Sequence, residues 1–222
     1  MKEKVIVSWS GGKDAALALH ELQRSRKYEI AGLLTTVTEE YDRISMHGVR
    51  RVLLERQADS LGFPLEEVLI SKNSSDEEYA RKMEKVLERY LAAGVSCVAF
   101  GDVFLEDVRQ YREGNLSKIG MKGLFPIWKR DTTELARTFI DLGFEALITG
   151  VDSKVLGRRF VGRVYDQQFL SELPPGVDPC GENGEFHSFV YAGPIFRKRI
   201  LHKKGKVVLR DKRFYYCDLI PV

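Results

Sequence analysis

The sequence predicts an α/β protein built around a parallel sheet, with a smaller part at its carboxyl end. Three observations support this fold class. Short apolar runs alternate with helical patterns over residues 1–150, glycine or polar residues directly follow the apolar runs, and the pattern changes after residue 150. Because strand–helix–strand units pair their strands in parallel, we expect a five-stranded parallel sheet with helices on both faces in residues 1–150. Residues 151–222 are expected to form a mixed α/β subdomain.

The expected elements of the first part follow one another regularly. Strands are predicted at residues 5–9, 30–37, 65–70, 95–100 and 145–149. Helices are predicted between them at residues 14–26, 49–61, 75–93, 105–113 and 131–143. Gly62 followed by Pro64 is a stop signal for the second helix. Ser75 and Glu78 have the spacing of a capping box at the start of the third helix.

The second part is rich in turn residues and short strands. Residues 173–184 include three prolines and three glycines and are expected to form a loop. Short strands are predicted at residues 188–191, 199–202, 206–210 and 214–219, with a hairpin turn at Lys204-Gly205. Nine Lys or Arg residues occur within residues 197–213, and we favour a solvated sheet edge over a docking surface for an acidic protein or RNA.

Composition excludes several classes of protein. The 222 residues include 35 Lys or Arg and 32 Asp or Glu, and this balance argues against a dedicated nucleic-acid coat. The three cysteines form no CxxC pair, so neither a zinc ribbon nor an iron–sulfur site is expected. No apolar stretch approaches the ~18 residues of a membrane span. We therefore expect a cytoplasmic protein with no membrane partner.

The strongest functional signal is the segment Ser10-Gly11-Gly12-Lys13-Asp14, which lies between the first predicted strand and helix. The two glycines allow the backbone to approach a ligand closely, and the N–H groups of the helix N-terminus point to the same place. Lys13 supplies positive charge, and Asp14 caps the helix or holds a metal ion. The spacing differs from a Walker A loop and from GxGxxG. A glycine turn before an Asp-capped helix, without a ligand, is the alternative interpretation.

This segment resembles the SGGxDS loop of the ATP pyrophosphatases, the PP-loop family, whose fold is adenine nucleotide alpha hydrolase-like. The resemblance implies that ATP and its pyrophosphate are bound by Ser10, Gly11, Gly12, Lys13, Asp14 and Ala15, with Asp14 as a Mg²⁺ ligand. Ala15 replaces the last serine of that loop, so one hydroxyl donor is lost while the backbone N–H of residue 15 remains.

Further segments resemble the diphthine–ammonia ligase family within that group. Residues 181–188, followed by Gly193-Pro194-Ile195-Phe196, are similar to its GEGGE[FY]ET…PLF signature. Residues 126–131 and Leu156-Gly157-Arg158 are similar to its P-x-W-x-R-D and LGR segments, and His47 occupies the place of a family histidine. The resemblance runs from about residue 4 to residue 200.

The resemblance implies an ATP-dependent amide ligase. In the family's reaction a carboxylate of diphthine, a modified histidine of elongation factor 2, is adenylated with release of pyrophosphate, and ammonia then displaces AMP. Adenylation is needed because a carboxylate alone has no stabilised leaving group to offer to ammonia. We therefore expect ATP and Mg²⁺ as cofactors, ammonia and diphthine or a related carboxylate as substrates, and no nucleic-acid partner. A homodimer is a further expectation.

The acceptor and ammonia site is expected at the second motif, at Glu182, Asn183, Gly184, Glu185 and His187. Asn183, His187 and Ser188 replace Gly, Glu and Thr of the family signature, which exchanges a carboxylate for an imidazole. Thr35 lies at the end of a predicted strand, and His47, Gly101 and Asp102 follow predicted strands. All four are expected near the nucleotide or the acceptor. The alternatives are a polar turn for the second motif and ordinary strand-end or surface positions for the other four residues.

Two other functions remain open from the sequence. A protein that binds or hydrolyses an adenine nucleotide without ligase activity agrees with the replacement at Ala15. A PP-loop enzyme that modifies RNA is disfavoured, because the chain has no paired cysteines for sulfur transfer and little net charge.

Overall fold

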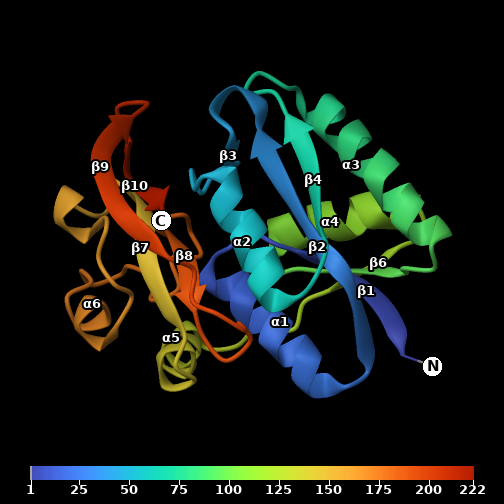
Figure 1. Cartoon of the computed structure of the whole chain (residues 1–222), viewed down its shortest axis with the longest axis horizontal. Coiled ribbons are helices and arrows are strands. Elements are labelled where there is room, and N and C mark those ends of the chain that lie inside the picture. Colours follow the sequence, from blue (N-terminus) through green and yellow to red (C-terminus); the bar gives the residue numbers. More distant parts are fainter. Residues whose placement is uncertain (1) are drawn as a thin grey trace.

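The computed structural model describes residues 2–222, which form two sheets with helices around them (Figure 1). The first part comprises β1 (Glu3–Ser8), α1 (Lys13–Ser25), β2 (Tyr28–Thr38), β3 (Arg43–Ile44), α2 (Arg51–Leu61), β4 (Leu65–Ile70), α3 (Asp76–Ala92), β5 (Cys97–Ala99), α4 (Glu106–Lys118) and β6 (Lys122–Leu124). The second part comprises α5 (Thr132–Asp141), β7 (Glu145–Asp152), α6 (Gln167–Ser171), β8 (Phe186–Ala192), β9 (His202–Arg210) and β10 (Phe214–Pro221). Single 3₁₀ turns lie at Glu39–Tyr41 and Arg158–Phe160.

The first sheet confirms the predicted α/β class. Within residues 2–222 its five parallel strands have the order β4-β2-β1-β5-β6, and β3 adds a short antiparallel pair at the end of β2. The chain moves outward from β1 through β2 to β4 and then returns to β5 on the other side of β1. The carboxyl ends of β1 and β5 therefore form the topological switch point, where open α/β sheets bind their ligands.

The fifth parallel strand is not the predicted one. β6 takes this place, and its three residues, Lys-Gly-Leu, are too few and too mixed to form an apolar run. The prediction that residues 145–149 belong to the parallel sheet is wrong, because β7 pairs antiparallel with β8 and β10. An apolar run shows that a strand is buried, but not the direction of its neighbours. The boundary predicted at residue 150 falls inside β7, whereas the change of sheet comes between Leu124 and Glu145. The division into two domains stays a prediction.

The second sheet is antiparallel, with the order β8-β7-β10-β9. The hairpin turn predicted at Lys204-Gly205 is wrong, because both residues lie inside β9. The turn is instead formed by Asp211 and Lys212, whose φ angles of 51° and 52° are those of a type I′ turn. The strand predicted at residues 199–202 is also wrong apart from its last residue, where β9 begins.

Helices cover both faces of the parallel sheet. Side chains of α3 and α4, including Leu87 and Leu116, pack with Ile6 of β1 on one face. On the other face α1 and α2 pack with Val5 and Val7, and the second sheet lies beyond these helices (Figure 1). None of the helices in residues 2–222 is long and apolar enough to cross a membrane.

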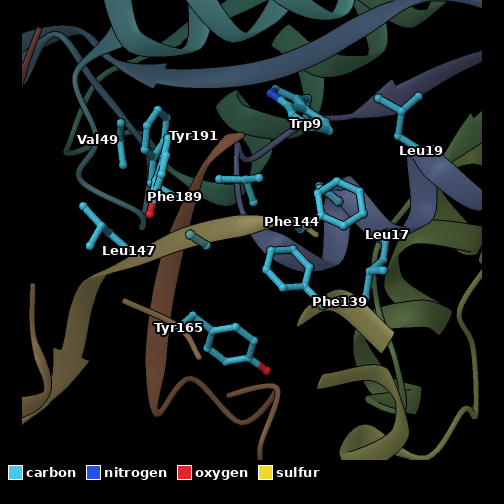
Figure 2. Close-up of a cluster of buried hydrophobic side chains, with 14 of the residues drawn as sticks. Trp9, Leu17, Leu19, Val49, Phe139, Phe144, Leu147, Tyr165, Phe189 and Tyr191 are labelled. Atoms are coloured by element: carbon cyan, nitrogen blue, oxygen red, sulfur yellow. The ribbon is translucent and has the colours of Figure 1, made fainter. Parts of the chain in front are cut away.

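The two parts share one hydrophobic core (Figure 2). Leu17 of α1 packs in the same cluster as Phe139 of α5 and Phe189 of β8. The rings of Phe139 and Phe144 are stacked with centroids 4.9 Å apart, and Tyr165 meets Phe139 edge-on at 5.5 Å. Burial of aromatic side chains contributes strongly to packing, so this cluster fixes the second sheet against α1. The position of α1 matters because the first functional motif lies at its N-terminus.

Candidate active site

Motifs that lie far apart in the sequence meet at the switch point. The carboxyl ends of β1 and β5 open into a cavity of about 210 Å³. Its lining includes predicted residues from the first loop, from the loop between β3 and α2, from the segment after β5 and from the second motif: Ser10, Lys13, Asp14, Ala15, His47, Gly101, Asp102, Glu182, Gly184 and His187. The structure thus brings together most of the residues predicted for the site.

The glycine loop is fixed by a buried glutamine that the sequence did not reveal. Gly11 has a φ angle of 77°, and a Cβ there would lie 2.8 Å from Oε1 of Gln57. The Gln57 amide donates to the carbonyl oxygens of Gly11 at 3.1 Å and Val190 at 2.6 Å, and its Oε1 accepts from the indole of Trp9 at 2.9 Å. The N–H of Val190 in turn donates to the Gly11 carbonyl at 2.9 Å. The loop is therefore bonded to α2 and to β8.

The N-terminus of α1 directs backbone donors at the cavity. Gly12 is the N-cap residue and supplies no side chain, and the N–H of Lys13 donates to the buried Ser188 hydroxyl at 3.1 Å. Asp14 and Ala15 come next, before the first intrahelical donation from Ala16 to Gly12, and both line the cavity. Unpaired N–H groups at a helix N-terminus bind anions such as phosphate. Ala15 is buried and its side chain has no polar atom, so a ligand can bond only to its backbone N–H.

Lys13 forms a buried ion pair with its neighbour. Its ammonium nitrogen lies 2.9 Å and 2.8 Å from the two carboxylate oxygens of Asp14, and it also donates to the carbonyl of Cys180. The rings of Phe186 and Tyr165 lie 5.4 Å and 5.8 Å from the same nitrogen. Burial is the largest influence on the pKa of Lys13 and lowers it, but the charge and hydrogen bond of Asp14, together with Cys180 and Glu182, outweigh burial and leave the pKa raised. The lysine thus remains charged next to the cavity.

The second motif divides into one carboxylate that faces the cavity and one that does not. Glu185 is buried, and its carboxylate accepts from the backbone N–H groups of Asp178 at 3.1 Å and Asn183 at 3.0 Å. The Asn183 amide also donates to Glu185 at 3.0 Å. Neither Glu185 nor Asn183 lines the cavity, so both stabilise the loop rather than contact a ligand there.

Glu182 is the carboxylate that the loop presents to the cavity. Its Oε1 accepts from the N–H of Val103 at 2.7 Å, which joins the second motif to the segment after β5. Burial raises the pKa of Glu182 to about 7, and the nearby Asp14 carboxylate adds to the increase. Glu182 is therefore close to half protonated at neutral pH. Groups with such a pKa are suited to proton transfer.

The segment after β5 supplies a glycine and an ion pair. A Cβ at Gly101 would lie 2.7 Å from the carbonyl carbon of Asp14 and 2.8 Å from the nitrogen of Ala15, so only glycine fits against the start of α1. Asp102 forms an ion pair with Arg112 of α4, with Nε and Oδ2 2.6 Å apart. Arg112 also lines the cavity and was not predicted from the sequence.

Two histidines from separate elements form one wall of the cavity. His47 lies between β3 and α2, His187 lies in β8, and their ring centroids are 4.7 Å apart. Burial lowers the pKa of His47 to about 3, with a further contribution from His187. Burial, together with the charge of Lys13, lowers the pKa of His187 to about 4. Both imidazoles are therefore neutral at pH 7.

A second cavity of about 200 Å³ adjoins the first. It shares Ser8, Ser10, His47, Phe100 and Arg112 with the first cavity and extends along the carboxyl-terminal part of β2. Thr35 and Thr36, of which Thr35 was predicted, lie here beside apolar residues that include Leu34, Met83, Leu87 and Val98. A cavity lined by both apolar side chains and hydroxyl groups is suited to a nucleoside.

Cys180 precedes the second motif but does not line the cavity. Cys180 is buried and donates to the Thr132 carbonyl at 3.4 Å, and burial raises its pKa, so it is an inert thiol. Residues 2–222 contain no cluster of three or more His, Cys, Asp or Glu side chains that could hold a metal ion by itself.

The chain matches two domains of one known protein family. Residues 3–123 match the diphthamide synthase N-terminal domain, and residues 131–218 match the diphthamide synthase C-terminal domain. The chain belongs to the diphthamide synthase family. This membership confirms the resemblance inferred from the sequence motifs. Between the two family domains lie residues 124–130, where the structure passes from the parallel to the antiparallel sheet.

Relatives of the chain in the diphthamide synthase family are named diphthine–ammonia ligase. The protein of Homo sapiens is 26% identical over 193 residues, which are 78% of this chain and 71% of that protein. The protein of Danio rerio is 26% identical over 234 residues, 94% of this chain and 89% of its own length. The protein of Schizosaccharomyces pombe is 25% identical over 92% of this chain, which spans only 37% of that longer relative.

Solved structures also resemble the chain, and one of them illustrates the level of similarity. It is described as a predicted subunit of tRNA methyltransferase from Methanocaldococcus jannaschii, and it matches 64% of this chain and 77% of its own at 20% identity, with a TM-score of 0.42. A similarity at this level carries no argument about function.

Proposed function

We propose that the protein is an ATP-dependent ligase that adenylates a carboxylate and converts it to an amide with ammonia, releasing AMP and pyrophosphate. Membership of the diphthamide synthase family and the names of the relatives support the reaction class. The observation that carries the proposal is the cavity at the switch point, where helix N-terminal N–H groups and a carboxylate with a pKa of about 7 share one space.

In this proposal, the first cavity binds the phosphates and the second binds the nucleoside of ATP. The N–H groups of Asp14 and Ala15 and the charge of Lys13 stabilise the negative charge on the phosphates. Thr35 lines the second cavity from the carboxyl-terminal part of β2. Fixing the triphosphate between two rigid elements, α1 and β8, orients the α-phosphorus for attack by the acceptor carboxylate.

The residues present also fit a magnesium ion. Mg²⁺ is usually held by one or two carboxylates together with phosphate oxygens and water, so no cluster of three protein ligands is needed. Asp14 lines the cavity, and its carboxylate can accept more hydrogen bonds or ligand contacts than the two from Lys13. Asp14 would hold the ion, which would supply charge neutralisation to the phosphates.

The amide-forming half of the reaction is assigned to the face that bears Glu182. Ammonium is not a nucleophile until it loses a proton, and a carboxylate with a pKa of about 7 can accept that proton at neutral pH. Glu185 and Asn183 act indirectly, because their hydrogen bonds keep the loop that presents Glu182 in place. The acceptor is diphthine or a related carboxylate, on elongation factor 2 in the former case. A cytoplasmic location and a homodimer stay predictions.

Product analysis tests the proposal. Purified protein with ATP, Mg²⁺, ammonium and candidate acceptors is expected to give AMP and pyrophosphate only when an acceptor is present, together with an acceptor that is lighter by one mass unit, as exchange of –OH for –NH₂ requires. Production of ADP and phosphate, without change in the acceptor, would instead show an ATP hydrolase.

A further inference from the structure

The wall formed by His47 and His187 has no role in the function proposed so far. The two side chains come from a loop of the first part and a strand of the second part, yet both line the phosphate cavity. Their centroids are 4.7 Å apart with ring planes at 43°. His47 also lies directly on the glycine loop, because a Cβ at Gly12 would be 3.2 Å from its Cε1 atom. The pair is therefore positioned beside the phosphate-binding backbone.

One ring nitrogen of the pair lacks a partner. Nδ1 of His47 is buried and accepts or donates no hydrogen bond within the part of the chain that is described, residues 2–222. Buried polar atoms are almost always paired, and exceptions occur at sites that a ligand or a water completes. Nδ1 has almost no exposed surface, so a phosphate oxygen in the adjoining cavity becomes its partner once the imidazole ring turns.

The charges around the pair change when a polyphosphate enters. The charged and titratable groups on the same cavity are Lys13 and Asp14 from α1, Asp102 and Arg112 from the β5–α4 region, and Glu182 from the second motif. Tyr216 of β10 does not line the cavity but approaches the loop between β3 and α2, which bears His47. Its ring would lie 3.0 Å from a Cβ placed on Gly48. Without a ligand, burial and Lys13 keep both imidazoles neutral.

We propose that His47 and His187 together bind one proton when the triphosphate binds, and that the resulting imidazolium donates hydrogen bonds to the phosphate oxygens. This inference rests on the proposed function, because it requires ATP in the first cavity. It assigns to the pair a role in binding the substrate and in stabilising the pyrophosphate that leaves.

The expected electrostatic effect is large enough. A single negative charge about 4 Å from an imidazole, at an effective dielectric constant of about 20, increases its proton affinity about a thousandfold. An increase of that size moves the pKa of His187 from about 4 to close to neutrality. A triphosphate carries several negative charges, so one proton can be held near pH 7 even though Lys13 opposes it.

The proton has a defined use in adenylation. An oxygen of the acceptor carboxylate bonds to the α-phosphorus, the bond from that phosphorus to the bridging oxygen breaks, and its electron pair remains on pyrophosphate. The imidazolium donates a hydrogen bond to the oxygen that gains this charge, and the proton returns to solvent as pyrophosphate leaves.

Proton uptake can be measured by titration calorimetry. The wild-type protein is titrated with α,β-methylene ATP and Mg²⁺ at pH 6.5 in two buffers of different ionisation enthalpy, because this analogue cannot be cleaved at the reacting bond. We expect an uptake of about one proton per analogue bound. His47→Gln and His187→Gln are expected to reduce the uptake to near zero and to weaken binding about tenfold or more. Glu182→Gln is expected to retain most of the uptake, which separates the histidines from the other titrating group.

The two remaining histidines provide matched controls. His20 lies in α1 with its ring edge-on to Phe144, and Nδ1 of His202 lies 2.9 Å from the Ile200 carbonyl, so neither faces the cavity. His20→Gln and His202→Gln are expected to keep the wild-type uptake. Nitrogen-15 spectra of the protein with labelled histidine provide a second measurement. The signals of His47 and His187 are assigned by their loss in His47→Gln and His187→Gln. In the wild-type protein, one of these two signals should change from the neutral to the imidazolium pattern when the analogue binds.

Each outcome decides the proposal. Analogue binding with no proton uptake, or with both imidazoles still neutral in the spectra, overturns the role of the histidines and leaves the proposed ATP-binding function intact. Absence of analogue binding to the wild-type protein overturns both. Proton uptake that persists in His47→Gln and His187→Gln but disappears in Glu182→Gln would show that Glu182 binds the proton, and this result also overturns the proposal.

Discussion

The loop at residues 10–15 and the loop at residues 178–188 reach the same cavity in different ways. In the first loop the groups offered to a ligand are mainly backbone N–H groups, whose direction is fixed by the start of α1. In the second loop they are side chains, and Glu185 is used within the loop while Glu182 faces the cavity. A site made of backbone donors can therefore be predicted from glycines and a helix start, whereas the direction of a carboxylate depends on folded contacts.

Loss of the ion pair in the first loop should have the largest effect. Lys13→Ala and Asp14→Ala are each expected to abolish formation of AMP and pyrophosphate, because one removes charge from the phosphate site and the other leaves a buried ammonium unpaired. Removing one partner of a buried pair also destabilises a protein by about 3–5 kcal/mol. Turnover is measured as pyrophosphate release and stability by urea denaturation. Wild-type turnover in either variant would refute the assignment of this loop.

Backbone geometry at the first loop can be tested without removing a charge. Gly101→Ala would place a Cβ against the backbone of Asp14 and Ala15, and we expect ATP cleavage to decrease about a hundredfold because the start of α1 must move. Gly114→Ala is the matched control, since a Cβ there meets no atom within 4 Å and a helical alanine is favoured over glycine by about 1 kcal/mol. Equal rates of ATP cleavage in the two variants would show that the contact at Gly101 is unimportant.

The two glutamates of the second loop should differ in kind. Glu182→Gln retains an acceptor for Val103 but cannot take up a proton, so amide formation should decrease about tenfold or more with little change in stability at low pH. Glu185→Gln turns an N–H donor toward backbone donors and should cost about 1–3 kcal/mol of folding free energy, with a smaller effect on the chemical step. The comparison needs single-turnover rates and denaturation curves for both variants, and identical profiles would remove the distinction.

The raised pKa of Glu182 predicts a pH effect of definite sign. A carboxyl group with a pKa near 7 in the folded state and 4.5 in the unfolded state binds protons more tightly when folded, so its contribution to stability decreases as pH rises from about 4.5 to 7. Relative to the wild type, Glu182→Gln should therefore gain about 1–3 kcal/mol of stability over this interval. Urea denaturation at several pH values measures the difference, and a constant difference between pH 4 and pH 8 would contradict it.

The smallest effect is expected at Tyr216, which packs against the loop that bears His47. The Tyr216 hydroxyl donates to the Met46 carbonyl at 3.1 Å, and its ring packs against Gly48 and Gly150. Tyr216→Phe removes only the hydrogen bond and should cost about 1 kcal/mol with nearly unchanged turnover. Tyr216→Ala also removes the ring and should reduce pyrophosphate release as the loop that bears His47 loses its packing. A larger effect of the Phe variant on turnover would give the hydroxyl a direct role.

Local sequence signals predicted the elements of the first part well. The strand at residues 65–70 has the predicted limits, and Ser75 caps α3 by accepting from the N–H of Glu78 at 3.2 Å. These features depend on residues close in sequence. β6 and the antiparallel partners of β7 were not predicted, because a three-residue strand has no periodicity and pairing direction is decided by distant segments. The turn at Asp211 and Lys212 was missed because Gly205 is the more familiar turn residue.

The candidate site shows the same limit. Glycines, the lysine and the cavity-facing Glu182 were found from motifs, since these residue types and spacings have chemical meaning. Gln57 and Tyr216 were not found, because a glutamine in a helix and a tyrosine in a strand give no signal until tertiary contacts exist. In the same way, the sequence does not show that the Glu185 carboxylate points into its own loop, because this direction depends on tertiary contacts.

The hydrogen bonds from β8 to the glycine loop have a consequence for the order of folding. The Lys13 N–H is bonded to Ser188, which is 175 residues later in the chain, and Gly11 is bonded to Val190. During synthesis the loop therefore leaves the ribosome well before its partners in β8. The first sheet alone cannot hold the loop in its final form, and β8 must be made and folded before ATP has a finished place to bind.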